Sequence, residues 1–454
     1  MIGWQRSRVR RDRAELGLDE HFSHRELHMR FQRTRGRAVG QIAIATVGST
    51  VYNLSQWGLL VVISRLSDQA SVGLYSYALA VTAPIALLFG MNMRQSYVTE
   101  DLNRRTFWPY YNLRVGSAIA LVVLFGILST TLPNGGVVMF AIGFAKVLDL
   151  LGDYLLAVSQ KIGNLAHLGI ANSINGLVTF STVFLALVMG VSVELSLALT
   201  VCGSLAALVY VVCVVKQSNA EVGPLITLRW WRRIGDPIPR LRPWRLFVTL
   251  IPLGLAAGMA SARVTLPRYA LEAYWGLEMI GVFSAALHIT TAANALVMAL
   301  AQFSLPNLVS RFRQNGPLAL RRPIFQLCAF WLVVGVIVTI LAYFYGPWML
   351  GAIYGPEYVT EDLMWVLAVS WALSSVASMV DLGLTTLRQF QLQLYVNVVA
   401  FIVTIIAVLA VVPNSGLLGT AWAAVVSAFA LLVVRVGFLW HSTRSGAVID
   451  VGSS

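Results

Sequence analysis

Twelve apolar segments follow one another along the chain, each long enough to cross a lipid bilayer as a helix. A hydrocarbon core of about 30 Å takes ~20 consecutive apolar residues in an α-helix. A basic, proline-containing stretch at 216–245 interrupts the pattern and separates two sets of six segments. The predicted spans lie near 39–63, 73–93, 113–132, 137–157, 167–189 and 194–215, and then near 246–266, 279–304, 324–345, 362–386, 391–412 and 417–440.

The composition agrees with this pattern, because 57% of the 454 residues are hydrophobic and only 12% are charged. Soluble domains carry about a quarter charged residues, so a single soluble globule is excluded. The predicted fold class is an all-α polytopic membrane protein with two six-helix lobes. The expected organisation is a basic extension at 1–38, an N-lobe at 39–215, a basic linker at 216–245, a C-lobe at 246–440 and a tail at 441–454.

The basic residues predict the orientation of these spans. If the N-terminus is cytoplasmic, the segments on that side hold 27 of the 33 lysines and arginines. Such an asymmetry is typical of cytoplasmic loops, so both termini are expected in the cytoplasm. The net charge of +13 is thereby explained by topology, and no nucleic-acid partner is expected. In the extension, Ser23 and Glu26 have capping-box spacing, which leaves open a short helix over 24–35 or a disordered basic tail.

The two halves resemble each other in sequence. At an offset of 208 residues, seven positions of the second span match the eighth, including Gly73 with Gly281. At an offset of 228, Asp153 falls on Asp381 in the fourth and tenth spans. A transporter built from two parallel repeats around a central cavity is the expected architecture.

Amide and histidine side chains form stripes on several predicted helices. These candidates are Asn53 and Gln56 in the first span, Asn172 and Asn175 in the fifth, and His288 in the eighth. A single stripe is explained equally well by helix packing through polar side chains. Several together favour a hydrated cavity.

Charged residues inside the spans cost ~2.5–3.5 kcal/mol each on insertion scales, so they mark either pairs or a functional site. Arg94 and Arg263 are the candidate anion-binding arginines, whereas Arg65 and Arg268 are expected at span ends, reaching the interface. Lys146, Asp149 and Asp153 share one helix face and can neutralise one another. Asp381 has no partner so near, Arg388 lying two turns on.

Several catalytic sites are absent from the sequence. None of the three lysines follows a glycine, so the phosphate-binding Gly-Lys-Ser/Thr loop is missing, and there is no His-Glu-x-x-His or Cys-x-x-Cys. No metal site is expected, and the pair Gly254 and Gly258 is interpreted as a helix-packing face.

Three stretches resemble the polysaccharide transport family of flippases: Val72-Gly-Leu-Tyr-Ser-Tyr-Ala-Leu-Ala, running on to Pro84 and Met91-Asn-Met-Arg94; Gly281-Val-Phe-Ser-Ala-Ala-Leu, running on to Gln302-Phe-Ser-Leu-Pro306; and Tyr354-Gly-Pro-Glu-Tyr358. The resemblance spans residues 39–440. It implies the fold of the multidrug/oligosaccharidyl-lipid/polysaccharide (MOP) flippase superfamily and a cationic cavity. Relatives often carry a basic residue in the fifth span, where this chain has Asn172 and Asn175.

The function implied by the resemblance is movement of undecaprenyl-diphosphate-linked oligosaccharide from the inner to the outer leaflet of a bacterial inner membrane. Such a flippase serves synthesis of O-antigen, capsule or exopolysaccharide, acts as a monomer, and has polysaccharide polymerase and glycosyltransferases as candidate partners. Arg94, Arg263 and His288 would hold the diphosphate or acidic sugars. Asn53, Gln56, Asn172 and Asn175 would bind sugar hydroxyls.

The sequence also suggests residues for energy coupling and leaves two alternative functions open. Asp153 or Asp381 would couple H⁺ or Na⁺, and no other cofactor is expected. A cation-coupled multidrug antiporter of the same fold would need unpaired carboxylates. A membrane-embedded polymerase or glycosyltransferase would need large outer loops, and the predicted outer loops are short.

Overall fold

The computed structural model describes residues 24–99, 104–130, 135–161, 164–218, 243–387 and 390–444. Most of the predicted linker, the first 23 residues and the tail after 444 lie outside these ranges. The elements are α2 His24–Leu66, α3 Gln69–Gly90, α4 Met93–Thr99, α5 Arg104–Ser129, α6 Gly136–Lys161, α7 Ala166–Val188, α8 Val193–Ala198, α9 Thr200–Ser218, α10 Pro243–Trp275, α11 Leu277–Ala292, α12 Asn294–Asn315, η3 Pro317–Leu320, α13 Arg321–Ile353, η4 Pro356–Tyr358, α14 Leu363–Thr386 and α15 Phe390–Arg444.

These helices make twelve crossing segments within the described ranges. Eight helical segments are long and apolar enough to span a membrane by themselves. Helices α2 and α6 run beside them, α11 and α12 form one broken crossing, and α15 is two antiparallel segments joined at Gly416, where φ is +51°. The predicted all-helical, twelve-span fold is confirmed. The predicted helix over 24–35 is the beginning of α2.

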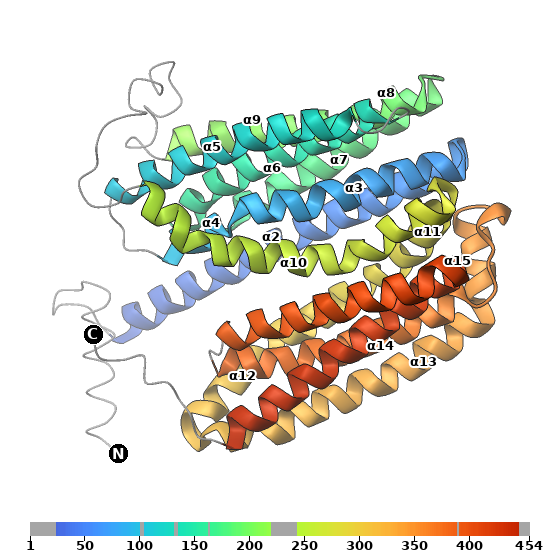
Figure 1. Ribbon diagram of the computed structural model, residues 1–454. Coiled ribbons are helices and arrows are strands. Elements are labelled where there is room, and N and C mark those ends of the chain that lie inside the picture. The colour runs from blue at the N-terminus through green and yellow to red at the C-terminus, as the bar shows by residue number, and fades with distance from the viewer. Residues whose placement is uncertain are drawn as a thin grey trace.

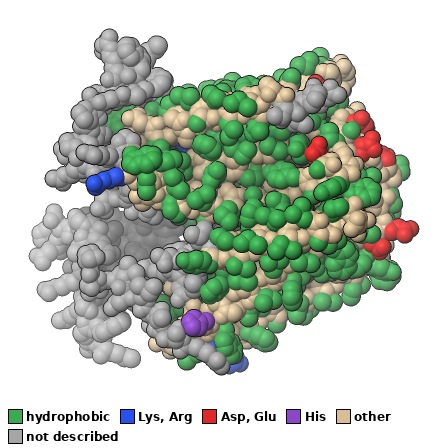
Figure 2. All heavy atoms as spheres, in the orientation of Figure 1, with side chains coloured by type: hydrophobic (Ala, Val, Ile, Leu, Met, Phe, Trp, Pro, Cys, Tyr) green, Lys and Arg blue, Asp and Glu red, His purple; other side chains and the backbone are tan. Residues whose placement is uncertain are grey.

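The outer surface is that of a multi-pass membrane protein. Large aliphatic and aromatic side chains along α13 are more than half exposed, among them Phe325, Val336 and Phe344. Figure 2 shows hydrophobic side chains over most of the visible face, with acidic side chains gathered at one end. This is the end at which α2 ends and α3 begins, and we call it the acidic end.

A short polar turn joins α2 to α3 at the acidic end. The Asp68 carboxylate accepts a hydrogen bond of 2.9 Å from the backbone N–H of Ser71 and so caps α3. Hydrogen bonding by Ser71, mainly from its side chain and also from its backbone N–H, holds the pKa of Asp68 below its ordinary value. The cap explains why α3 begins at Gln69, four residues before the predicted span.

The two lobes meet through α3, which packs against both α10 and α11 (Figure 1). A Cβ atom on Gly73 would overlap the carbonyl of Leu277, and one on Gly281 would overlap the carbonyl of Gln69. Because Gln69 and Leu277 are themselves 208 residues apart, the contact is reciprocal about a pseudo-twofold axis. The sequence repeat is therefore also a repeat in space. Farther along, Gly254 lies against the carbonyl of Leu88, as its predicted packing role requires.

Hydrogen bonds reinforce this contact at the acidic end. The Arg65 guanidinium donates to the carbonyls at the end of α13, including that of Ile353 at 2.9 Å. Trp57 Nε1 donates to Tyr354 Oη at 2.9 Å, and Gln69 Nε2 donates to the Glu357 carbonyl at 2.6 Å. Arg65 lies exposed in the last turn of α2, at the span end where it was expected, and there it satisfies carbonyls that the end of α13 leaves free. The lobes are thus closed at the acidic end.

We expect Gly281→Ala to open this closed end. The added methyl group meets backbone, which cannot move aside as a side chain can, and such overpacking costs about 1–3 kcal/mol. A cost of that size shifts a two-state population by about ten- to a hundredfold. Spin labels at Ser67 and Val359, in a background without the native cysteines, measure the separation of the lobes.

Gly116→Ala is the matched control, because nothing lies within 4 Å of the added atom in α5. Unchanged label distances in Gly281→Ala would contradict the role of the glycine contact.

Candidate functional site

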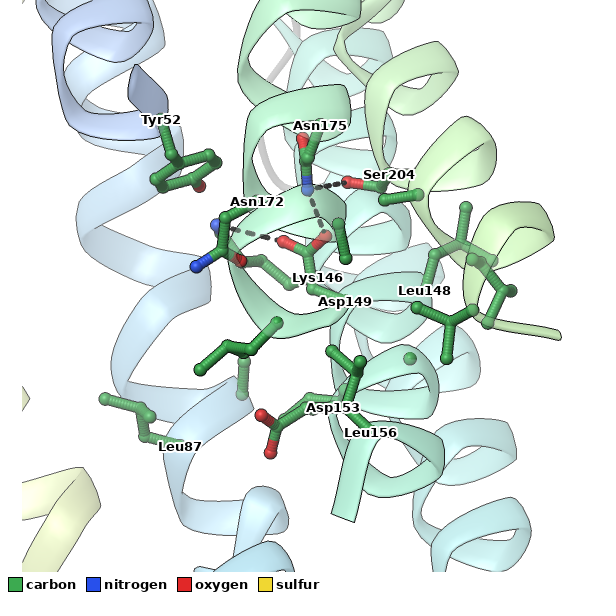
Figure 3. A pocket seen from close by; sticks show the side chains of 18 of the residues that line it. Tyr52, Leu87, Lys146, Leu148, Asp149, Asp153, Leu156, Asn172, Asn175 and Ser204 are labelled. Carbon is green, nitrogen blue, oxygen red and sulfur yellow. Dashed lines mark hydrogen bonds and ion pairs between the residues drawn. The ribbon is translucent and has the colours of Figure 1, made fainter. Parts of the chain in front are cut away.

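A pocket of about 480 Å³ lies inside the N-lobe, between α2 and α3 on one side and α6, α7 and α9 on the other. In Figure 3, Tyr52 and Leu87 approach from α2 and α3, opposite the polar side chains of the other three helices. Those polar residues are Lys146, Asp149 and Asp153 from α6, Asn172 and Asn175 from α7, and Ser204 from α9. The structure therefore brings together both predicted asparagines of the fifth span and one predicted aspartate.

The polar end of the pocket is a hydrogen-bonded network. Lys146 Nζ lies 3.4 Å from Asp149 Oδ2, and Asn175 Nδ2 donates to Asp149 Oδ1 at 2.8 Å. The same amide group lies 3.5 Å from Ser204 Oγ, and Asn172 Nδ2 donates to Ser49 Oγ at 3.2 Å. Neutralisation of Lys146 by Asp149 is confirmed. The charged groups are paired, yet each keeps about a quarter of its side chain exposed.

A second ion pair lies at another side of the pocket. Arg94 Nη1 is 2.8 Å from Asp153 Oδ1, and Arg94 Nε donates to Gln160 at 2.9 Å. The Asp153 side chain is still 39% exposed. The predicted anion-binding arginine and the predicted ion-coupling aspartate are thus partners of each other.

Arg114 is a buried cation in this region that sequence reasoning missed. Its side chain is only 1% exposed, and Nη2 donates to the Gly90 carbonyl at 3.1 Å. That carbonyl is freed because α3 ends there, with Met91 and Asn92 both at positive φ. Asp153 is the nearby acid that offsets the charge. The sequence signal for this buried cation was the position of Arg114, the second residue of the predicted third span.

A cavity of about 20 Å³ adjoins the polar end of the pocket. It is large enough for one water molecule, since a water needs about 10–15 Å³. Gln56 lines it and accepts a hydrogen bond of 2.8 Å from Tyr75 Oη. Asn53, predicted to act with Gln56, is exposed on α2 and does not line either cavity.

The C-lobe has its own polar cluster, between α10, α14 and α15. Arg263 Nη1 donates to Ser427 Oγ at 3.1 Å, and Ser427 is 2.6 Å from Thr404 Oγ1. Arg435 Nη2 is 3.2 Å from Asp381 Oδ1, and Arg435 also donates to the Ala377 carbonyl at 3.1 Å. The prediction that Asp381 has no close partner is wrong. Its partner lies 54 positions later, on α15, while Arg388 falls outside the described residues.

The two clusters occupy corresponding places in the two lobes. The Asn175–Ser204 contact joins α7 to α9, and the Thr404–Ser427 bond joins the two segments of α15 in the same way. Asp153 and Asp381 match at the sequence offset and each pairs with an arginine. The chemistry nevertheless differs, because the N-lobe cluster also contains a second acid, Asp149, paired with Lys146, and the two asparagines of the fifth span.

Arg268 and the predicted binding residue His288 lie on the neighbouring helices α10 and α11. Helix α10 continues to Trp275, so Arg268 lies about two turns inside the helix and the expectation of a span end is wrong. Its Nε is buried without a hydrogen-bond partner among the described residues. His288 is close enough to Arg268 for the guanidinium charge to act on the imidazole ring. On α11 His288 lies seven residues beyond Gly281, on the same face, and so below the closed contact with α3.

No family model matches the sequence. The chain is 22% identical over 393 residues to the capsular polysaccharide biosynthesis protein CapF of Staphylococcus aureus, covering 85% of this chain and 95% of that protein. An inward-facing multidrug resistance MATE family transporter of the MOP superfamily matches with a TM-score of 0.65 and 14% identity, over 92% of this chain and all of the other. The lipid II flippase MurJ, in an inward closed conformation, matches with a TM-score of 0.65 and 11% identity, over 88% and 87%.

These likenesses show the fold. The chain has the architecture of the MOP superfamily transporters, two six-helix lobes, and the resemblance drawn from the sequence is confirmed at that level. The roles of the individual site residues stay predictions.

We expect Asp381→Asn to destabilise the protein by about 1–3 kcal/mol, because it leaves the mostly buried Arg435 without its charged partner. The double variant Asp381→Asn/Arg435→Gln should recover much of this loss, since no uncompensated charge is left. Thermal unfolding in detergent measures both.

Glu361→Gln, at an exposed acid of the acidic end, is the control and should leave the unfolding temperature unchanged. A single variant as stable as the wild type would mean that the ion pair has no structural role.

Proposed function

We propose that this protein is a flippase that moves undecaprenyl-diphosphate-linked oligosaccharide across a bacterial inner membrane by alternating access. The product would serve synthesis of a cell-surface polysaccharide such as O-antigen, capsule or exopolysaccharide. The observation that carries the proposal is the excess of arginine in the middle of the C-lobe. The likeness to a capsule biosynthesis protein and to a lipid II flippase supports it.

The C-lobe arginines fit a diphosphate. Arg263, Arg268 and Arg435 lie within α10 and α15, at least seven residues from the helix ends, and Asp381 pairs with Arg435. Buried Nε atoms of all three arginines have no partner among the described residues. A guanidinium group presents its donors in a planar fork that matches phosphate oxygens, and two phosphates offer acceptors for several such forks. His288 beside Arg268 adds a donor to this site.

The distribution of end charges supports the orientation. The acidic end carries Asp68, Glu194, Glu272, Glu278, Glu357, Glu361 and Asp362, and the opposite end carries Lys161, Lys216, Arg245, Arg311, Arg321 and Arg322. Figure 2 shows acidic side chains gathered at one end of the visible face. Basic loops mark the cytoplasmic side. The closed acidic end then faces outward, both termini are cytoplasmic, and the structure is inward-facing.

The exposed face of α2 suits the lipid part of the substrate. Ile44, Val47 and Leu54 are between 45% and 62% exposed, and Asn53 is exposed next to them. The side-chain contacts that join α2 to the second lobe come from its last three turns, beginning at Trp57. A polyprenyl chain would stay in the bilayer along this helix while the diphosphate enters between the lobes.

The alternatives fit less well. A cation-coupled multidrug antiporter needs a free carboxylate, whereas Asp149, Asp153 and Asp381 each pair with a cation. A polymerase or glycosyltransferase needs a folded outer region, and the described outer connections are turns and the short helices α8 and η4. We therefore infer a transporter rather than an enzyme. Coupling to H⁺ or Na⁺ through Asp153 or Asp381 would require one of the two ion pairs to open.

Leaflet-resolved labelling of lipid-linked oligosaccharide tests the function. In cells that lack the protein, the labelled glycan should accumulate in the inner leaflet and fail to reach the outer leaflet. Outward appearance at the wild-type rate would reject the assignment.

We expect Arg263→Ala and Arg268→Ala each to slow outward movement by about ten- to a hundredfold, because each removes a charged hydrogen-bond donor to the diphosphate. Membrane insertion should be retained. The measurement is the same labelling assay in complemented cells.

Arg245→Ala removes an exposed arginine at the start of α10 and is the charge-matched control. Full activity of both site variants would remove these arginines from the site.

A further inference from the structure

The N-lobe pocket is separate from the C-lobe arginines, and its two ends differ in chemistry. One end is the network of Lys146, Asp149, Asn175 and Ser204. The remaining walls contain the polar residues Asp153 and Asn172 and are otherwise largely apolar. Their apolar side chains come from all the surrounding helices except α2: Ala83, Ala86, Leu87, Leu148, Leu150, Leu156, Leu168, Ala171, Ala207, Leu208 and Val211. A ligand that fits must be polar on one side and apolar on the other.

We propose that this pocket binds one sugar of the glycan and selects a sugar with an apolar substituent, namely an acetamido sugar or a 6-deoxy sugar. The inference rests on the proposed flippase function and specifies which glycans it carries. Its volume of about 480 Å³ lies within the range of ~300–1,000 Å³ that is usual for small-molecule sites. One pyranose ring with its substituents fits this space.

The polar end offers what sugar hydroxyls need. The Lys146 ammonium donates, the Asp149 carboxylate accepts, and the Asn175 amide and Ser204 hydroxyl do both. Because these groups already hold one another in place, they are oriented before the sugar arrives and lose little freedom on binding. Tyr52 lines the same end and presents a ring and a hydroxyl.

The apolar walls supply the selectivity. A sugar with hydroxyls around the whole ring would bury some of them against leucine and alanine, where they find no hydrogen-bond partner. An acetamido methyl or a C6 methyl group instead gains by leaving water. A change of one methyl group in a hydrophobic site alters binding by about tenfold or more.

The pocket is reachable from outside the N-lobe. Asp153 lines it with a side chain that is 39% exposed, and Leu87 lines it with a side chain that is 42% exposed. A glycan whose diphosphate binds the C-lobe arginines and whose sugar enters this pocket would contact both lobes at once. Recognition of the sugar would then be coupled to the movement of the lobes.

Binding to the purified full-length protein in nanodiscs tests the inference. The probes are undecaprenyl diphosphate, undecaprenyl-diphospho-N-acetylglucosamine and undecaprenyl-diphospho-glucose, each competing against a fluorescent polyprenyl diphosphate. The wild type should bind the N-acetylglucosamine lipid about tenfold more tightly than the glucose lipid. Ala207→Leu, which fills the pocket with methyl groups, should abolish this preference and leave the affinity for bare undecaprenyl diphosphate unchanged.

Leu205→Phe is the matched control, because Leu205 lies on the same helix, is 49% exposed, and does not line the pocket. It should keep the tenfold preference. Equal affinity for the two glycolipids in the wild type, or a preference that survives Ala207→Leu, would overturn the sugar pocket and leave the flippase proposal standing. Failure of bare undecaprenyl diphosphate to bind would overturn the flippase proposal and the pocket with it.

Discussion

Charge in hydrocarbon is the constraint on which this structure depends. An ion within a bilayer must be paired or must face water or a ligand. The acids Asp149, Asp153 and Asp381 are all paired, each with a lysine or arginine of its own lobe. These three acids are all paired, but the described cations outnumber them in both lobes. Arg94, Arg114 and Lys146 accompany two aspartates in the N-lobe, and Arg263, Arg268 and Arg435 accompany one in the C-lobe. The remaining positive charge must therefore face water or a ligand.

The two lobes share a scaffold and differ in chemistry. The same helix positions carry Asn175 and Ser204 in one lobe and Thr404 and Ser427 in the other. Around this common pair, the N-lobe has a pocket with a polar network at one end and largely apolar walls, whereas the C-lobe has an arginine-rich cluster. A substrate with a charged head and an uncharged sugar chain would match this difference, whereas a compact cation would match neither lobe.

The crossing segments and the repeat could be predicted from sequence, because hydropathy and segment length respond to the bilayer and not to neighbours. The partners of the charged residues could not. Asp381 pairs with Arg435 because of how α14 and α15 are rotated against each other, a relation that spacing along the chain does not contain. Arg268 was misplaced for a simpler reason: α10 runs on past Pro267, a residue that in a soluble helix would argue for an end.

The closed end shows how such a molecule can change state without unfolding. The contacts that hold it depend on backbone, with glycines 73 and 281 lying against carbonyl oxygens and Arg65 binding carbonyls at the end of α13. Carbonyls at a helix end can be satisfied by water as well as by a guanidinium, so breaking these contacts leaves no buried group unpaired. The ion pairs deeper in each lobe join helices of the same lobe and would survive the change. The contacts between the lobes can therefore break and form again, whereas the ion pairs within each lobe persist. Rocking of two rigid bodies requires this difference.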